Sequence, residues 1–431
     1  MLYAIIPAMR FIADLHVHSH YSRATSPDMS PEGIWKWAQL KGITVIGTGD
    51  FTHPQWLKEL KQKLEPAGNG LFTLRKKYWT GEVPGSCKAD VYFILSAEIS
   101  CIYGKNGKTR KVHSVILAPD FAAAERLNRT LTRIGNLKSD GRPILGLDAK
   151  KLLQLTLDAS PSNLYIPAHA WTPHFSVLGA ASGFDSLIEC YEELTPNIYA
   201  IETGLSSDPL MNWRLSSLDT ITLVSNSDAH SAAKIGREAN VFSTELSYAG
   251  MLSAIRTKKG FMGTIEFFPE EGKYHYDGHR DCGVSLTPKE TIKYNDLCPV
   301  CNKKLTIGVM HRVEKLADRE PGFKPKNAPS FSSIIPLPDI IAEGLQCGVN
   351  TKKVRALYFP LLEQLGNEFK VLLQSPLDDI ERAGTVLIRE AVARMRAGTV
   401  HIVPGYDGEY GKVRIFEDAE RNKIIKRMKL G

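Results

Sequence analysis

Short runs of consecutive apolar residues recur along the chain up to about residue 262. They cover residues 43–48, 91–97, 112–118, 164–168, 197–202 and 220–225. Runs of this length are typical of strands that are buried on both faces. Helix signals lie between them, as at Ser30-Pro31, where a capping serine precedes a proline at the first helical position of a helix that should end at Gly42. The pattern predicts an α/β fold with a mostly parallel sheet, open or closed into a barrel.

The pattern changes near residues 268–269. Residues 270–306 are polar and rich in turn-forming residues, and residues 307–431 are mostly of helical character with a Pro/Ser-rich stretch at 321–339. We therefore expect an α/β domain over residues 1–265, a small metal-binding ribbon over 266–306, and a mostly helical, basic C-terminal domain over 307–431.

Composition narrows the class of protein only slightly. The net charge of +7 is compatible with a nucleic-acid partner without requiring one. The apolar N-terminal stretch 1–15 contains Arg10 and has no basic leader, so it predicts a buried first strand. No run approaches the ~20 apolar residues of a membrane span, and we expect a cytoplasmic protein with no membrane partner. The seven cysteines, an odd number, argue against a disulfide framework.

Histidines and carboxylates stand at the ends of the predicted strands. They are His16, His18, Asp50, Glu98, His113, His169, Asp228 and His230. Strand ends meet at one edge of such folds, and buried carboxylates without partners are costly unless a metal compensates them. Mixed imidazole and carboxylate donors favour zinc, manganese or iron over calcium, and magnesium also stays a candidate. Eight donors exceed the needs of one ion, so we expect two or three divalent ions that hold a phosphate ester and activate water.

Two further polar patterns accompany this set. The first is an H-x2-C pattern followed by a C-x2-C pattern, formed by His279, Cys282, Cys298 and Cys301. This is the spacing of a zinc ribbon, so it predicts one structural zinc. His275 is an alternative ligand to His279. Glu202 ends the run 197–202, where it would face the cavity or hydrogen-bond a ligand histidine.

The segments DLHVHSHYS, GTGD, AEIS, KVHS, PAHAWTP and SNSDAHS resemble the successive motifs of the PHP (polymerase and histidinol phosphatase) superfamily. The resemblance implies a distorted seven-stranded β/α barrel over residues 1–265, with a trinuclear metal centre held by the eight residues above. It implies catalytic roles for Asp228, Glu98 and His113. One motif departs from the family, because Phe51 and not a histidine follows Asp50; we favour Asp50 as the ligand over His53.

The order of barrel, ribbon and basic helical tail resembles the endonuclease Q family. The segments GKYH (272–275) and VPGYDGEYGKV (403–413) add to the likeness. It implies a DNA repair endonuclease that cuts 5′ of deaminated bases (uracil, hypoxanthine, xanthine) or abasic sites, with replication or repair proteins as further partners. The alternatives are a PHP phosphatase or exonuclease acting on small phosphate esters or nucleic-acid ends, and a non-catalytic scaffold.

An enzyme of this kind must extrude the damaged base into a pocket. Trp171 and Tyr191 lie near His169 in sequence and are candidates for the pocket wall, with core packing as the alternative for each. Tyr406 and Tyr410 stand in a glycine-rich loop and either stack on bases or belong to an ordinary hairpin.

Overall fold

The computed structural model describes residues 9–428 of the chain. The first strand, β1 (Met9–Asp14), agrees with the prediction from Met9 onward, and residues 1–8 of that prediction lie outside the described part. Within residues 9–428, no helix is both long enough and apolar enough to cross a bilayer.

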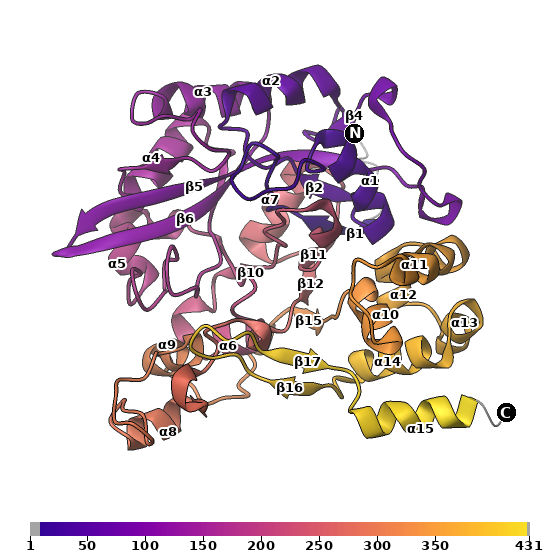
Figure 1. Cartoon of the computed structure of the whole chain (residues 1–431). Helices are drawn as coiled ribbons and strands as arrows, with labels where there is room; N and C mark the ends of the chain where they lie inside the picture. Colours follow the sequence, from indigo (N-terminus) through magenta and orange to yellow (C-terminus); the bar gives the residue numbers. More distant parts are fainter. Residues whose placement is uncertain (1–8, 429–431) are drawn as a thin grey trace.

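One large sheet organises residues 9–266 and also includes β15 from later in the chain (Figure 1). Its order is β15–β12–β11–β1–β2–β5–β4–β3, with β6 and β7 paired to β5, and β8 paired to β6. The strands are β2 (Val45–Gly47), β3 (Leu64–Pro66), β4 (Phe72–Leu74), β5 (Tyr92–Lys105), β6 (Lys108–Ala118), β7 (Ile144–Leu145), β8 (Leu164–Pro167), β11 (Ala239–Thr244), β12 (Phe261–Glu266) and β15 (Ser330–Ser333). β9 (Ala200–Glu202) and β10 (Thr222–Val224) pair in parallel in a separate small sheet. A mixed α/β architecture is confirmed, and the closed seven-stranded barrel stays a prediction.

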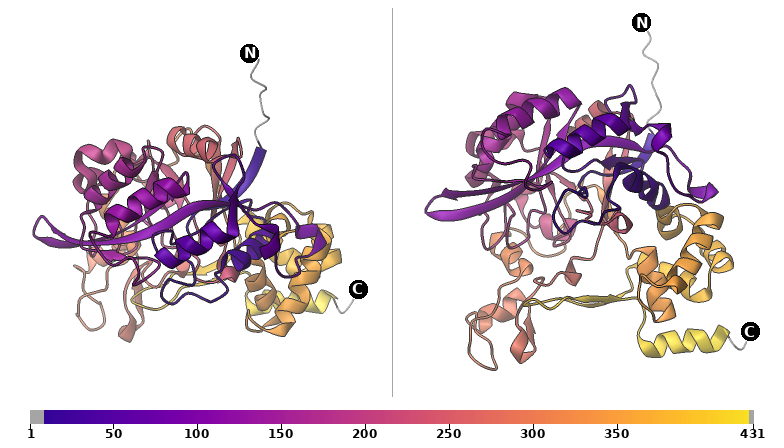
Figure 2. Two further views of the ribbon diagram at one scale, coloured as in Figure 1. Left: turned by 90° about the horizontal axis from the view of Figure 1, so that it is seen from above. Right: turned by 45° about the horizontal axis from the view of Figure 1, so that its top comes forward.

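The sheet is mixed, so the prediction of a mostly parallel sheet is wrong. β1–β2 and β2–β5 are parallel, but β1–β11, β5–β6 and β6–β8 are antiparallel. The runs 91–97 and 112–118 belong to one long hairpin, which projects beyond the helices in Figures 1 and 2. Asn106 and Gly107 close it with φ angles of 54° and 70°, as a type I′ turn requires. A run of apolar residues indicates that a strand is buried, but it does not indicate whether the strand pairs with its neighbours in parallel or antiparallel.

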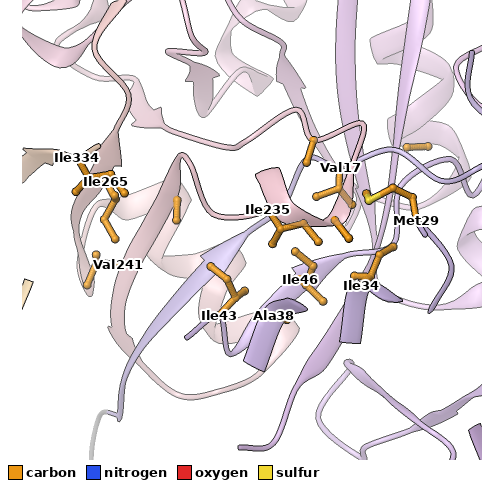
Figure 3. Packing of buried hydrophobic residues seen from close by; sticks show 14 of the residues in the cluster. Val17, Met29, Ile34, Ala38, Ile43, Ile46, Ile235, Val241, Ile265 and Ile334 are labelled. Carbon is orange, nitrogen blue, oxygen red and sulfur yellow. The ribbon is translucent and has the colours of Figure 1, made fainter. Parts of the chain in front are cut away.

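Helices cover the sheet and bury its apolar residues. They are α1 (Pro31–Lys41), α2 (Pro54–Lys63), α3 (Phe121–Leu131), α4 (Ala149–Ala159), α5 (Leu187–Tyr191), α6 (Pro209–Asn212) and α7 (Tyr248–Thr257). The predicted limits of α1 are confirmed: the Ser30 side chain accepts from the Gly33 amide, and Gly42 ends the helix at φ 90°. Figure 3 shows Ile34 and Ala38 of α1 packed near Ile46 of β2 and Val17.

Beyond residue 266, the chain forms two further groups of packed helices and strands. The first holds β13 (Asp277–His279), β14 (Val284–Leu286), α8 (Pro288–Lys293) and α9 (Val309–Leu316). After β15, the second holds α10 (Leu337–Leu345), α11 (Lys352–Leu365), α12 (Glu368–Leu373), α13 (Leu377–Ala383), α14 (Val386–Ala397) and α15 (Asp418–Met428). The hairpin β16 (His401–Val403)–β17 (Lys412–Arg414) runs from the helical assembly toward α6 and α9 (Figure 1).

Candidate metal centre

Two tripeptides, His16-Val17-His18 and Asp228-Ala229-His230, bring four polar side chains beside the main sheet. Val17 pairs with Ala229 in a parallel bridge, and both are buried in the apolar core. His16 and His18 flank Val17, so alternation along the backbone turns both imidazoles away from the core. Asp228 adopts φ 46° and His169 adopts φ 29°, which is strained backbone for residues other than glycine. Such strain is concentrated at functional sites.

The first cluster of ligand atoms contains His16, His18, Glu98 and Asp228, whose donor atoms lie within 4.8 Å of one another. His18 Nε2 lies 3.0 Å from Asp228 Oδ1 and 3.2 Å from Glu98 Oε2. His16 Nε2 lies 3.5 Å from the same Glu98 oxygen. Imidazole and carboxylate atoms therefore converge on one small volume.

A second cluster contains Glu98, His113 and His169. Here Glu98 uses its other oxygen: Oε1 lies 2.7 Å from His113 Nδ1 and 3.1 Å from His169 Nε2. Glu98 thus offers one carboxylate oxygen to each cluster, in the manner of a carboxylate that bridges two metal ions.

The donor atoms fit divalent ions. His16 Nε2, His18 Nε2 and Asp228 Oδ1 are buried and make no hydrogen bond of acceptable geometry, although they lie close together. Burial opposes ionisation of Glu98, but its 2.7 Å contact with His113 Nδ1 and the charge of Arg142 outweigh burial and hold the pKa of Glu98 well below its usual range. Burial lowers the pKa of His113 to about 4. At His16 and His18 the neighbouring carboxylates Glu202 and Asp50 outweigh burial and raise the pKa of each imidazole well above its usual range, so both would release a proton when they bind a metal.

Hydrogen bonds behind the clusters orient the histidines. Glu202 Oε1 lies 3.0 Å from His16 Nδ1, and Asp50 Oδ1 lies 3.1 Å from His18 Nδ1. A carboxylate in this position keeps the proton on Nδ1 and leaves Nε2 free to bind a metal. The expectation that Glu202 hydrogen-bonds a ligand histidine agrees with this geometry.

Asp50, the favoured ligand of the second motif, lies behind His18. Asp50 Oδ2 accepts hydrogen bonds from Ser19 N (2.7 Å), Ser19 Oγ (2.7 Å) and Ser22 Oγ (2.9 Å), and its Oδ1 faces His18. Both carboxylate oxygens of Asp50 therefore have protein partners, and Asp50 does not join either cluster. His53 does not join either cluster, and its Nδ1 caps α2 by accepting from Trp56 N.

His230 lies at the edge of the first cluster. Its ring centroid is 4.3 Å from that of His18, and its Nδ1 is 3.0 Å from the Asp228 carbonyl oxygen. It is partly exposed and belongs to neither cluster, so its predicted role as a ligand stays a prediction.

Arg142 is a residue of the site that sequence patterns did not indicate. Its Nη1 donates to Glu98 Oε2 at 3.0 Å, and about a third of its side chain is exposed. It precedes β7 and stands in no strand-end motif. Its one sequence signal is the preceding glycine, Gly141, where a Cβ would collide with Asp50 and Ser22.

The predicted zinc ribbon has its four ligand atoms together. Donor atoms of His279, Cys282, Cys298 and Cys301 lie within 4.8 Å of one another, and Cys301 Sγ is 3.6 Å from His279 Nδ1. His275, the alternative ligand, is buried outside this group. The donor set of three thiols and one imidazole suits tetrahedral zinc.

The aromatic candidates divide into two groups. Trp171 and Tyr191 are fully buried; Trp171 Nε1 donates to Asn212 Oδ1, and Tyr191 Oη lies 3.4 Å from Tyr165 Oη. Both belong to the core, so the prediction that they wall a pocket is wrong for this structure. Tyr406 pairs its backbone with Tyr276 and Glu409 in the hairpin loop, whereas the Tyr410 side chain is 69% exposed.

Phe175, which also lies near His169 in sequence, sits at the second cluster. Its ring centroid is 4.7 Å from that of His113, and its backbone has φ 62°. Lys111 Nζ lies 5.2 Å from the Phe175 ring centroid.

Two solved structures match the whole chain. The lesion-specific endonuclease PfuEndoQ from Pyrococcus furiosus aligns with a TM-score of 0.82 and 32% identity over 97% of both chains. Endonuclease Q in complex with a 27-mer duplex substrate, with an abasic lesion at the active site, aligns with a TM-score of 0.80 and 32% identity over 96% of this chain and 98% of that one.

Sequence relatives extend the comparison. The family model of the MJ0043 C-terminal domain matches residues 336–399. The uncharacterized protein MJ0043 of Methanocaldococcus jannaschii is 31% identical over 269 residues, which is 60% of this chain and only 32% of that longer protein. The uncharacterized protein YqxK of Bacillus subtilis is 26% identical over 420 residues, covering 94% of this chain and 99% of that one.

The fold is mixed α/β, and histidines and carboxylates gather in two clusters that share Glu98. Together, these features define a metal-dependent phosphodiesterase. The solved structures, at 32% identity over almost the whole chain, show the family: the chain belongs to the endonuclease Q family.

Proposed function

We propose that this protein is a DNA repair endonuclease that hydrolyses the phosphodiester on the 5′ side of uracil, hypoxanthine, xanthine or an abasic site. The observation that carries the chemistry is the position of Glu98, whose two oxygens serve two separate ligand clusters. The likeness to endonuclease Q bound to an abasic duplex supports DNA as the substrate.

Two divalent ions would be held by the two clusters, with His230 as a candidate ligand of a third. When bound, they would polarise the phosphoryl oxygens and lower the pKa of water. Glu202 and Asp50 would keep His16 and His18 in the binding tautomer. Arg142 would hold a phosphate oxygen at the partly exposed side of the centre, since a guanidinium matches phosphate geometry.

The three parts of the chain would then have separate tasks. Residues 1–265 would carry the hydrolytic centre, residues 266–306 a structural zinc, and residues 307–431 would contribute to DNA binding. A structural zinc is supported by the convergence of His279, Cys282, Cys298 and Cys301.

Asp228→Asn tests the centre directly. Asp228 Oδ1 is a buried donor of the first cluster, so an amide there should weaken metal binding and lower nicking by at least about 100-fold. The assay uses a duplex with one internal uracil and blocked ends, with thermal unfolding measured in parallel. The exposed Asp378, on α13, supplies the matched control Asp378→Asn, which should nick at the wild-type rate.

Three results would contradict the proposal. Undiminished nicking by Asp228→Asn would show that the two clusters are not the catalytic site. Cleavage by the wild type confined to free ends or phosphomonoesters would support the phosphatase or exonuclease alternative. Metal analysis with a single zinc per chain would indicate a non-catalytic domain.

A further inference from the structure

A cavity of about 350 Å³ lies at the end of the main sheet that is remote from the metal-ligand clusters. β12 runs in the same direction as β1, because both strands pair antiparallel with β11. The ligand histidines His16 and His18 follow the end of β1, whereas the cavity is lined by Phe261 and Gly263 from the beginning of β12. The cavity is therefore separate from the proposed hydrolytic centre.

Three parts of the chain form the walls of this cavity. They are the segment from α6 to β10, the end of α7 with the first half of β12, and residues 325–330. β15 pairs in parallel with β12, and this pairing brings residues 325–330, within the Pro/Ser-rich stretch, to the cavity. Pockets for drug-sized ligands span ~300–1,000 Å³, so the cavity is large enough for a small organic molecule.

Apolar side chains from all three parts line the cavity, and two of them are aromatic. Trp213 follows α6 and Phe261 begins β12, and both side chains are almost fully buried. Pro325, Ala328 and Pro329 stand in the segment before β15. Apolar walls with aromatic rings favour a ligand that contains a flat ring.

One polar side chain of the lining lacks a partner. Thr264 is 5% exposed, and its Oγ1 makes no hydrogen bond of acceptable geometry. Thr222, which also lines the cavity, differs in this respect, because its Oγ1 donates to the Ile255 carbonyl oxygen at 2.7 Å. An unpaired buried hydroxyl is costly, so a ligand group that bonds to Thr264 would gain affinity.

The charged residues of the lining leave an excess of positive charge. Asp219 is the acidic residue among them, and its two carboxylate oxygens accept from Arg319 at 2.7 and 2.5 Å. Lys258 and Lys326 are the basic residues, and Lys258 donates to the carbonyl oxygen of Asp219, which neutralises no charge. An anionic group is therefore the favoured partner for these two ammonium groups.

The backbone of Lys258 points in the same direction. Lys258 ends α7 with φ 60°, in the left-handed region where glycine is the favoured residue. Burial also lowers the pKa of its ammonium group, a shift that a neighbouring anion would counteract. The chain thus places a partly buried cation where glycine would be less strained, as is common at binding sites.

We propose that this cavity binds a small aromatic anion. The ring lies between the apolar walls, the anionic group faces Lys258 and Lys326, and a polar substituent of the ring bonds to Thr264. Phosphate and carboxylate groups share this chemistry, so a nucleoside monophosphate and an aromatic carboxylate are the two sources of such a ligand. The site is independent of the endonuclease activity proposed above.

Isothermal titration calorimetry on the full chain with its metals bound tests the site. The two probes are adenosine 5′-monophosphate and salicylate, and at least one of them should bind. The uncharged counterpart of that probe, adenosine or salicylamide, should bind at least about tenfold more weakly, because it lacks the anionic group. The probe that binds identifies the source of the ligand.

Two variants locate the binding. Lys258→Met should weaken it at least about tenfold, because the cation is lost. Ala328→Trp, which fills the cavity from the half-buried segment before β15, should abolish it. The exposed Lys259, next in sequence and outside the cavity, supplies the control Lys259→Met, which should bind as the wild type does. Thermal unfolding is measured for each variant to confirm that it is folded.

Binding of neither probe would overturn the site, as would binding that Lys258→Met or Ala328→Trp leaves unchanged. Asp228→Asn, at the first metal-ligand cluster, should bind the probe as the wild type does. Loss of binding in Asp228→Asn, with binding kept in the two cavity variants, would show that the probe binds at the metal-ligand clusters and would also overturn the site.

Discussion

Arg142 brings a positive charge to the centre of the site without belonging to any motif. The preceding Gly141 explains its position: its amide donates to the Tyr21 carbonyl at 3.0 Å, and its surface touches Asp50 and Ser22, where a side chain would collide. The residues that orient His18 therefore also position Arg142. Its guanidinium contacts the same Glu98 oxygen that faces the first cluster.

We expect Arg142→Met to lower kcat on lesion DNA by roughly 100-fold, because a charged donor to the phosphate is lost. Arg142→Lys should recover part of the rate, since the charge returns without the two-pronged geometry. Steady-state kinetics and metal content are measured together. Arg23→Met, at a side chain that is 81% exposed, is the control. A normal kcat would refute the phosphate role, and loss of the metals bound at the two clusters would show that Arg142 acts by positioning Glu98.

The ribbon is an element with almost no core of its own. Its buried apolar cluster consists of Val284, Cys298 and Leu305, and two of its four candidate ligands, His279 and Cys282, are only half-buried. Such a segment offsets little of the conformational entropy of folding by burial, so we expect a bound metal to supply the difference. Zinc sites of this type contribute ~10–16 kcal/mol in isolated fingers.

Cys301→Ser should therefore remove one zinc per chain and unfold residues 277–306 locally, while the unfolding temperature of the α/β domain stays within a few degrees of wild type. Zinc analysis and hydrogen exchange resolved by segment measure both effects. The control is Cys347→Ser, at a half-buried thiol that lies 3.3 Å from Thr351 Oγ1 and outside the ribbon. Retained zinc, or exchange unchanged in the ribbon, would contradict the assignment.

The α/β domain and the C-terminal helices are joined by a buried ion pair. Lys41 Nζ at the end of α1 lies 2.7 Å from Glu368 Oε2 at the start of α12, and both side chains are almost fully buried. Glu368 also accepts from Leu337 N at 3.0 Å and from Tyr358 Oη at 2.8 Å. Gly42 lies against the Asn367 side chain, where a Cβ would collide. The relative placement of the two parts therefore depends on close, specific contacts.

Lys41→Met should lower the free energy of unfolding by about 3–5 kcal/mol, because Glu368 would remain buried without its partner. Lys41→Met combined with Glu368→Gln should recover part of that loss, since the uncompensated charge is gone. Denaturant unfolding measures both, with Lys58→Met on the exposed face of α2 as the control. Equal stability of Lys41→Met and wild type would mean that the pair contributes nothing to the contact.

Local patterns predict the ligand histidines, Glu98, Asp228 and the ribbon, because these residues follow strand ends or occupy short fixed spacings that the backbone itself brings together. The limits of α1 follow from Ser30 and Gly42 for the same reason. Other features depend on segments that are distant in sequence. Long-range packing, which no local pattern records, determines the antiparallel β5–β6 pairing and the burial of Trp171 and Tyr191. It also places Asp50 behind His18 and Arg142 against Glu98.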